Sequence, residues 1–279
     1  MAIFDIMKLL ERIFAFYINS SLHVALAVIA LVGVTVLEYS LQLPFWFWIF
    51  VFFGAITGYN FVKYAKIAGL HHRDLSNSLK SIQIFSLLCF SVFVWSIFHQ
   101  HFMTLVVTAG FGLLNILYAI PFFHHKSLRM FSSVKIFVVA VVWAGATVII
   151  PVIANETQVS GDILLTFFQR VFIVVVLILP FEIRDVPYDA FYLKTLPQQL
   201  GNRNTKLLGL SLLIFCLVLE FFKSGLSPAY ILGIFIFTIS TGWMLLISKT
   251  NQSTYFSSFW VEGLSIFWFL IYVLFYRIF

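Results

Sequence analysis

Apolar runs of membrane-spanning length alternate with short polar segments along nearly the whole chain. A helix needs about 20 apolar residues to cross a ~30 Å hydrocarbon core, whereas a barrel strand needs only about 10, with strict alternation. The runs in this sequence fit helices. They predict nine spans, at about 21–38, 45–62, 82–98, 103–120, 134–153, 164–182, 207–222, 228–247 and 257–276.

The first 20 residues follow a different pattern. Asp5, Lys8 and Arg12 recur at positions i, i+3 and i+7, with apolar residues around the rest of the turn. This spacing predicts an amphipathic helix that lies on the membrane surface. Because no small-residue cleavage site follows it, we interpret this helix as part of the folded protein rather than as a signal peptide.

Composition agrees with this membrane pattern. Of 279 residues, 62% are hydrophobic and only 10% are charged, whereas soluble domains carry about 25% charged residues. We therefore expect an all-α fold, a polytopic membrane helical bundle in one domain: an interfacial helix at 1–20 and nine spans over 21–279. Cys89 and Cys216 both lie in apolar runs, which predicts buried free thiols.

The basic residues are unevenly distributed between the two sides that nine spans define. Of 17 Lys and Arg residues, only Arg170, Lys223 and Arg277 fall on the side opposite the N-terminus. The positive-inside rule therefore predicts a cytoplasmic N-terminus and a C-terminus on the other side. The net charge of +6 is explained by this topology and by contact with membrane lipids, not by a nucleic-acid partner.

An acidic stretch interrupts the pattern at the end of the sixth span. Glu182, Asp185 and Asp189 lie at i, i+3 and i+7 in "FEIRDVPYDAF", although the chain has only 11 acidic residues. Pro187 disfavours a continuous helix, so we expect a helix end, a turn and a new short helix. Clustered carboxylates in dry surroundings need a cation, and oxygen ligands suit Mg²⁺. The alternative is a solvated loop whose acids pair with nearby basic side chains: Arg184, Lys194 or Arg203.

The stretch "EIRDVPYDAFYLKTLPQQLG" resembles the second aspartate motif of the UbiA-type intramembrane prenyltransferase superfamily. Members typically read D-x-x-D-x-x-x-D at this place, followed by a basic residue, T-L-P and a turn to L-G. Glu182, Asp185 and Asp189 match the acids, and Lys194 begins the matching tail. The position after the sixth of nine spans also matches, so the resemblance covers nearly the whole chain.

The resemblance implies a nine-helix bundle around a central cavity and a transferase activity. Members of the superfamily move an isoprenoid group from a diphosphate donor to a lipophilic acceptor, with Mg²⁺ between two aspartate motifs neutralising the diphosphate. Carried over to this chain, Asp185 and Asp189 would be catalytic. Glu182, Asp185 and Asp189 would hold the metal, while Arg184 and Lys194 would contact the isoprenoid diphosphate.

The sequence departs from the family in the first aspartate motif, N-D-x-x-D-x-x-x-D, which here reads "NFVKYAKIA". Asn60 matches, but Phe61, Tyr64 and Ala68 stand where the aspartates belong. One interpretation is that Lys63 and Lys66, with Asn60 and Tyr64, hold the diphosphate directly and leave one Mg²⁺ on the second motif. A second is that these lysines pair with the acids and close the site. A third is that they only anchor the loop at the membrane.

Two functions follow from this mixture. The first is a divergent UbiA-like membrane prenyltransferase. The alternative is a non-catalytic protein with the same fold, a pseudoenzyme that binds lipid or serves as a scaffold subunit for membrane protein partners. A transporter is disfavoured because the spans lack a chain of ionisable groups and show no evident pair of broken helices.

Overall fold

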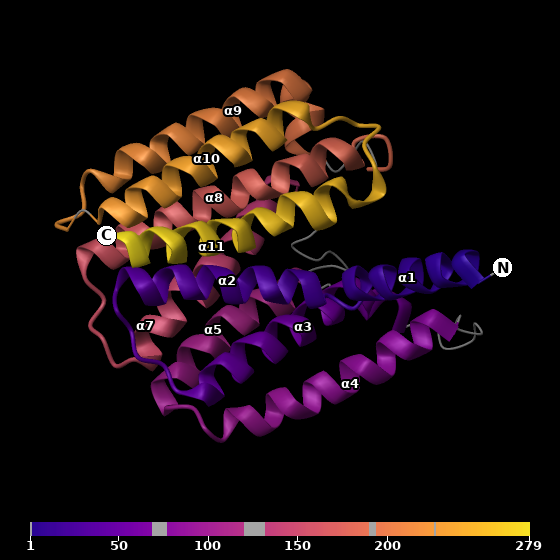
Figure 1. Cartoon of the computed structure of the whole chain (residues 1–279), viewed down its shortest axis with the longest axis horizontal. Helices are drawn as coiled ribbons and strands as arrows, with labels where there is room; N and C mark the ends of the chain where they lie inside the picture. The colour runs from indigo at the N-terminus through magenta and orange to yellow at the C-terminus, as the bar shows by residue number, and fades with distance from the viewer. Residues whose placement is uncertain (1, 69–76, 120–131, 190–193, 226) are drawn as a thin grey trace.

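The computed structural model describes residues 2–68, 77–119, 132–189, 194–225 and 227–279. Within these ranges the chain forms helices that run roughly along one direction (Figure 1). In chain order they are α1 (Ala2–Asn19), α2 (Leu22–Glu38), α3 (Phe45–Ala68), α4 (Asn77–Ile97), α5 (Phe102–Ala119), α6 (Ser132–Ala144), the π-helix η2 (Gly145–Ile149), α7 (Ile150–Ala154), α8 (Gly161–Asp185), α9 (Leu196–Glu220), α10 (Pro228–Ile247), the π-helix η4 (Phe256–Val261) and α11 (Glu262–Ile278).

The helices close into a ring. α2 packs between α3 and α11, and α3 also contacts α4 and α5. From α5 the contacts continue through α6, α8, α9 and α10 back to α11. Figure 1 shows α2 to α5 in one half of the bundle and α8 to α11 in the other. α2, the second helix of the chain, thus packs against the last helix, α11, and closes the ring.

Burial follows the apolar pattern of each helix. α2 and α8 are apolar on most sides, and their side chains form much of the core. A helix that is hydrophobic all round belongs in an interior. The outer helices instead leave large apolar side chains uncovered, such as Leu87, Phe102, Ile214 and Trp243. These surfaces face lipid, and the protein is an integral multi-pass membrane protein.

Each predicted span coincides with a helix or a group of consecutive helices. Seven of the described helical spans are long and apolar enough to cross a membrane, and up to eight if α1 and α2 together form one. α5 is also apolar, but its described part is shorter. The polytopic helical bundle is therefore confirmed, whereas the count of nine crossings stays a prediction.

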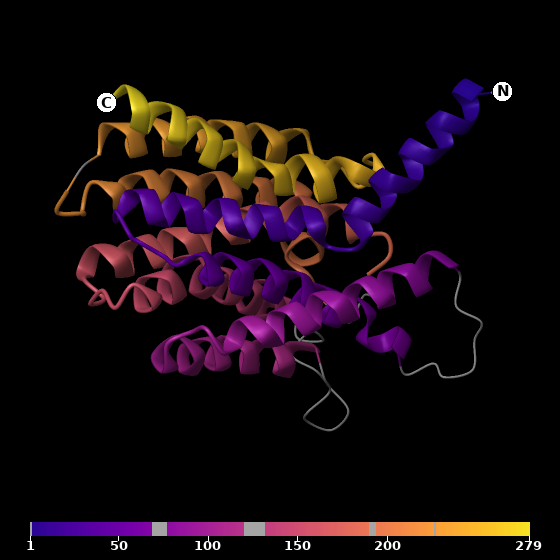
Figure 2. The same ribbon diagram turned by 60° about the horizontal axis from the view of Figure 1, so that its bottom comes forward.

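α1 leaves the bundle at an angle. Its described part is bent by 54° from α2, and Figure 2 shows it leaning away from the other helices. Ile6, Met7, Leu10 and Ile13 on α1 are more than half exposed. This geometry suits a helix that rests on a lipid surface, although its position in the membrane stays a prediction.

Three local features refine the sequence prediction. α9 begins at Leu196, well before the predicted 207, because its first turns are polar and hydropathy does not detect them. Gly201 interrupts α9 with a φ of 77°, a conformation that favours glycine. Cys89 and Cys216 are buried free thiols, as predicted.

Candidate functional site

The acidic stretch begins inside α8 and ends in a turn. α8 finishes at Asp185, whose carbonyl accepts hydrogen bonds from the backbone N–H groups of Tyr188 and Asp189, both at 2.9 Å. The segment 186–189 is therefore a turn wound around one carbonyl, and the rest of the stretch in which a new short helix was expected, 190–193, lies outside the described residues. Gln198 at the start of α9 donates to the Asp189 carbonyl at 3.1 Å and fixes the far side of the turn.

A lysine from a neighbouring helix lies between two of the three acids. The Lys135 ammonium of α6 lies 2.7 Å from Glu182 Oε1 and 4.0 Å from Asp189 Oδ2. The Glu182 side chain is 8% exposed and that of Asp189 19% exposed, so both carboxylates are largely shielded from water. Lys135 therefore compensates charge where water cannot.

The third acid has a separate partner. Asp185 is held by the neighbouring Arg184, whose Nε and Nη2 donate to the two carboxylate oxygens at 2.7 and 3.1 Å. Both side chains are about one-third exposed, which makes this pair the more accessible of the two. The Arg184 guanidinium also lies over the Phe181 ring, 5.3 Å from its centroid. We call Glu182, Asp185 and Asp189 the acid cluster.

The residues predicted from the first motif lie in a different environment. Asn60 is buried; its amide donates to Ser20 O and Ser86 Oγ, and its carbonyl oxygen accepts from Ser21 Oγ. Lys63 and Tyr64 both donate to the Asn19 carbonyl, at 3.2 and 2.9 Å. These three side chains therefore hold the junction of α1 and α2.

The remaining predicted residues are less well defined. The side chain of Lys66 lies outside the described part of the structure. Lys194 is exposed, with a positive φ of 45°, just before α9. The positive charges of Lys63 and Arg184 both act on the carboxylate of Glu262 in α11. The ion pairs found for the acid cluster come from Lys135 and Arg184.

A large apolar cavity of about 1030 Å³ lies between α3, α4, α5 and α6. Its wall includes Gly54, Phe93, Phe111 and Gly112, and the predicted diphosphate ligands Asn60 and Tyr64 also reach it. Small-ligand sites typically occupy about 300–1,000 Å³ and are lined mainly by apolar groups. The size and lining therefore suit a substantial hydrophobic ligand.

A few polar groups interrupt the cavity wall. Trp143 Nε1 donates a hydrogen bond to the Tyr59 hydroxyl, and both residues line the cavity. The hydroxyls of Thr57 and Thr108 are buried there, and the described part of the chain offers them no hydrogen-bond partner. Such groups can orient a ligand without making the cavity hydrophilic.

One face of α6 connects the cavity with the acid cluster. Val138, Val139 and Val142 line the cavity and stand three, four and seven residues after Lys135. Residues at this spacing share a helix face. Lys135 is thus about one turn before the first α6 residue that lines the cavity, and its ammonium contacts the acid cluster.

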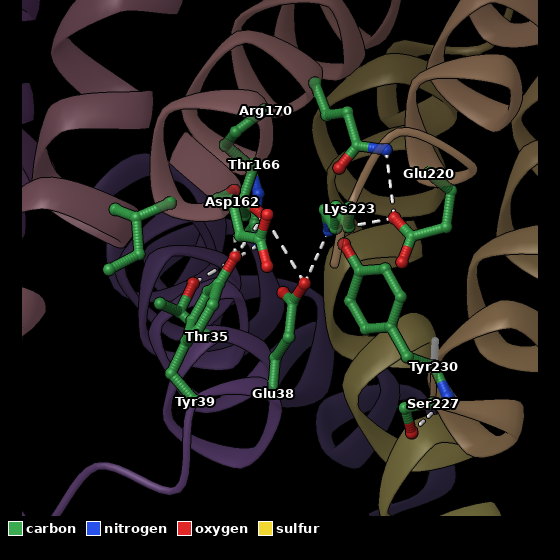
Figure 3. A network of polar contacts seen from close by, with 12 residues as sticks. Thr35, Glu38, Tyr39, Asp162, Thr166, Arg170, Glu220, Lys223, Ser227 and Tyr230 are labelled. Carbon is green, nitrogen blue, oxygen red and sulfur yellow. Dashed lines mark hydrogen bonds and ion pairs between the residues drawn. The ribbon is translucent and has the colours of Figure 1, made fainter. Parts of the chain in front are cut away.

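The opposite end of the bundle holds another group of buried charges (Figure 3). We call Glu38, Arg170, Glu220 and Lys223 the buried tetrad. The Lys223 ammonium lies 2.5 Å from Glu38 Oε1 and 2.8 Å from Glu220 Oε2. It also lies over the ring of Tyr230, 4.5 Å from the centroid.

Arg170 completes this tetrad without a direct ion pair. Its guanidinium donates to Leu31 O at 3.0 Å and to Thr35 Oγ1 at 3.4 Å, and it lies 4.9 Å from the centroid of the Trp268 ring. Two acids and two bases give this cluster zero net charge. Because it joins α2, α8, α9 and α11, its arrangement suits a structural junction.

Tyr39 bounds the buried tetrad at the end of α2. Its hydroxyl donates to Asp162 O at 3.0 Å and is 2.6 Å from Thr166 Oγ1 (Figure 3). Burial, and secondarily the nearby charge of Glu38, raises the pKa of this phenol. Tyr39 therefore remains a neutral hydrogen-bond donor at any physiological pH.

Comparison with known proteins finds similarity in structure only. No protein-family model matches the sequence, and neither does any curated protein. A UbiA homolog from Archaeoglobus fulgidus, solved bound to DMAPP and Mg²⁺, superposes with a TM-score of 0.61 at 12% identity, covering 95% of this chain and 99% of that one. A digeranylgeranylglyceryl phosphate synthase superposes with a TM-score of 0.56 at 12% identity, covering 96% and 98%.

The fold is that of the UbiA-type prenyltransferases. The likeness extends over almost the full length of both proteins, so the predicted superfamily resemblance is confirmed for the fold. At this identity the likeness carries no information on individual site residues. The roles predicted for the acid cluster and for Asn60, Lys63, Tyr64, Lys66, Arg184 and Lys194 stay predictions.

The acid cluster of this UbiA-type bundle does not fit a Mg²⁺ site as it is arranged. Among the described residues no three His, Cys, Asp or Glu side chains gather closely enough to hold a metal ion. The physical reason is that Glu182 is bonded to Lys135 while Asp185 is bonded to Arg184. The carboxylates that should share one cation are thus divided between two fixed ones.

Sequence reasoning missed Lys135 as a site residue. In the sequence it is one of the basic residues on the predicted cytoplasmic side, and a lysine before an apolar run is what the positive-inside rule leads one to expect. The feature that could have identified Lys135 is its spacing, because it lies on the same helix face as Val138, Val139 and Val142. That signal becomes specific only when α6 is known to pack against the end of α8.

Proposed function

We propose that the protein is a divergent UbiA-like membrane prenyltransferase, which transfers an isoprenoid group from a diphosphate donor to a lipophilic acceptor. The observation that carries the proposal is the continuity of one α6 face, from the apolar cavity to Lys135 and the acid cluster. A substrate with an apolar chain and an anionic head needs both environments in this order. The DMAPP bound to the Archaeoglobus neighbour supports the same class of donor.

The cavity would bind the isoprenoid chain, and the side chains of Lys135 and Arg184 would bind the diphosphate. A lysine ammonium has three N–H donors, and Glu182 uses one of them. Another donor remains for a phosphate oxygen. Arg184, partly exposed beside Asp185, supplies a second cationic contact. Further contacts with the diphosphate are proposed from the residues predicted by sequence. Two of them, Asn60 and Tyr64, line the cavity. The others are Lys63, Lys66 and Lys194.

The chemistry of transfer requires the allylic C–O bond to break, with its electron pair leaving on the diphosphate. The cations stabilise this leaving charge in a dry site, where electrostatic stabilisation is most effective. The allylic carbocation then forms a bond with the acceptor, which loses a proton. Asp189, whose Oδ2 is buried without a hydrogen-bond partner, is the proposed proton acceptor. Aromatic rings such as Tyr59 and Trp143 would stabilise the carbocation.

A second function is favoured by the ion pairs themselves. Since Lys135 and Arg184 already neutralise acids of the cluster, the protein could hold an isoprenoid lipid without reacting it. It would then be a pseudoenzyme, a lipid-binding or scaffold subunit of a membrane complex. In this alternative the cavity still binds an isoprenoid lipid, but no group is transferred.

Release of inorganic diphosphate separates these functions. The purified protein in lipid nanodiscs is incubated with polyprenyl diphosphates of several chain lengths, together with lipophilic acceptors. The transferase proposal predicts release that is lost in Asp189→Asn. Binding of the donor with no release would support the non-catalytic alternative, and absence of binding would contradict both.

Two glycines of α5 offer a matched test of the cavity. Neither Gly110 nor Gly112 has an atom within 4 Å of the position that a Cβ would take, but only Gly112 lines the cavity. Gly112→Leu should therefore weaken donor binding by about tenfold or more, which corresponds to ~1.4 kcal/mol. Gly110→Leu should leave it unchanged. Equal donor affinities in the two variants would show that the isoprenoid chain does not bind in this cavity.

A further inference from the structure

We infer that Lys135 is the built-in cation of the acid cluster and stands where a divalent metal ion would otherwise bind. The protein would then bind its diphosphate ligand without Mg²⁺. The ligand part of this inference rests on the proposed function, whereas the relation between Lys135 and the acids does not. The position of one ammonium group carries the argument.

The geometry gives Lys135 the contacts of a bridging cation. Its ammonium is 2.7 Å from Glu182 and 4.0 Å from Asp189, the first and last acids of the cluster. It arrives from α6, a helix that contributes no acidic residue to the cluster. Mg²⁺ is usually bound by one or two carboxylates together with substrate phosphates, so a cation between two carboxylates occupies a comparable position.

The charges are divided between two cations. Lys135 supplies one positive charge between Glu182 and Asp189, and Arg184 supplies another to Asp185. A divalent ion at the position of Lys135 would have to displace its ammonium from a shielded pair, and the cost of breaking this pair opposes metal binding.

The coordination capacity for a metal remains latent. Glu182 Oε2 and Asp189 Oδ2 are both buried and have no hydrogen-bond partner among the residues that the structure describes. If the ammonium were removed, these two oxygens would be the hard donors that Mg²⁺ or Mn²⁺ prefers. Loss of Lys135 should therefore convert the acid cluster from a lysine-neutralised site into a site that responds to metal.

Thermal unfolding with and without divalent ions tests this conversion. Lys135→Met keeps most of the side-chain volume and removes the charge. We expect the melting temperature of the wild type to be the same in EDTA and in millimolar MgCl₂ or MnCl₂. Lys135→Met should melt lower in EDTA and rise by about 2 °C or more on metal addition.

Two controls show whether the response belongs to the acid cluster. Lys135→Met combined with Glu182→Gln removes both charges of the pair and should lose the metal response. Lys249→Met removes an exposed lysine at the start of another loop and should never acquire one. A wild type that is stabilised by Mg²⁺, or a Lys135→Met variant that is indifferent to it, would overturn the inference. If Lys135→Met does not fold, the wild-type measurement and the ligand assay below decide.

Ligand binding provides an independent readout. Farnesyl thiodiphosphate, whose C–S bond resists ionisation, should bind the wild type with the same affinity in EDTA and in MgCl₂, within about twofold. Strict dependence of this binding on Mg²⁺ would overturn the inference. Failure to bind in either medium would instead contradict the proposed function, and the metal response of Lys135→Met would still test the role of Lys135.

Discussion

At the end of the bundle where α8 begins, Glu38 and Glu220 share one lysine, Lys223 (Figure 3), and none of these three side chains is more than 8% exposed. At the end where α8 finishes, Glu182 and Asp189 also share one lysine, but Asp185 and Arg184 are open to solvent. The buried tetrad balances to zero. The acid cluster with Lys135 and Arg184 retains one uncompensated negative charge.

The difference shows how the same ion chemistry serves two purposes. A closed cluster with balanced charge has nothing to gain from a ligand and holds helices together. A cluster that is partly exposed and incompletely balanced beside a cavity can still exchange partners. Burial of charges alone therefore does not distinguish the proposed functional end, which differs by its exposure and by its position one helical turn from the cavity-lining residues of α6.

The largest effect is expected from breaking the closed end. Lys223→Met would leave Glu38 and Glu220 buried without their shared cation, and we expect a loss of about 3–5 kcal/mol in the free energy of unfolding. Denaturant titration in detergent would measure it. Glu38→Gln combined with Glu220→Gln and Lys223→Met should recover much of the loss. A change below about 0.5 kcal/mol in the single variant, as expected for an exposed residue, would refute the structural role.

An intermediate effect is expected from the same change at the open end. Lys135→Met should lower the free energy of unfolding by about 2–3 kcal/mol, less than Lys223→Met, because some water reaches Asp189. Parallel titrations of the two variants would compare them directly. If Lys135→Met were more destabilising than Lys223→Met, the structural roles assigned to the two clusters would be wrong, because the acid cluster would then contribute more to stability than the buried tetrad.

The smallest effect on stability is expected at the exposed pair. Arg184→Gln breaks the contact with Asp185, but a pair with about one-third of each side chain exposed contributes only about 0–1 kcal/mol. Binding of farnesyl thiodiphosphate should nevertheless weaken several-fold, since the guanidinium is a proposed diphosphate contact. Intact affinity in Arg184→Gln would remove Arg184 from the site.

Most of the helical architecture could be predicted because lipid imposes a strong pattern on sequence. Runs of apolar residues located α2, α10 and the combined helix of η4 and α11 within two residues. The first turns of α9 were missed because polar helix and polar loop have the same hydropathy. The π-helix η2 was also missed, since the widening of a helix by one residue depends on its neighbours rather than on local composition.

The candidate site could be predicted only in part. The grouping of Glu182, Asp185 and Asp189 is visible in sequence because it is local. Their partner Lys135 lies 47 residues before Glu182 in the chain, and no pattern links a lysine to an acid on another helix. For the same reason the binding of Asn60 to Ser20 and Ser21 was unforeseeable, although the first motif drew attention to Asn60 itself.

That binding of Asn60 has a thermodynamic consequence. The same amide reaches the cavity wall and anchors the junction between α1 and α2. A ligand that competes for the Asn60 amide would weaken the attachment of α1 to α2. Because coupled equilibria are reciprocal, a change in the attachment of α1 would in turn change the affinity for this ligand. Lipid packing or curvature that pulls on α1 would then alter the affinity of the cavity. If α1 lies on the membrane surface as predicted, it would couple the mechanical state of the bilayer to occupancy of the cavity.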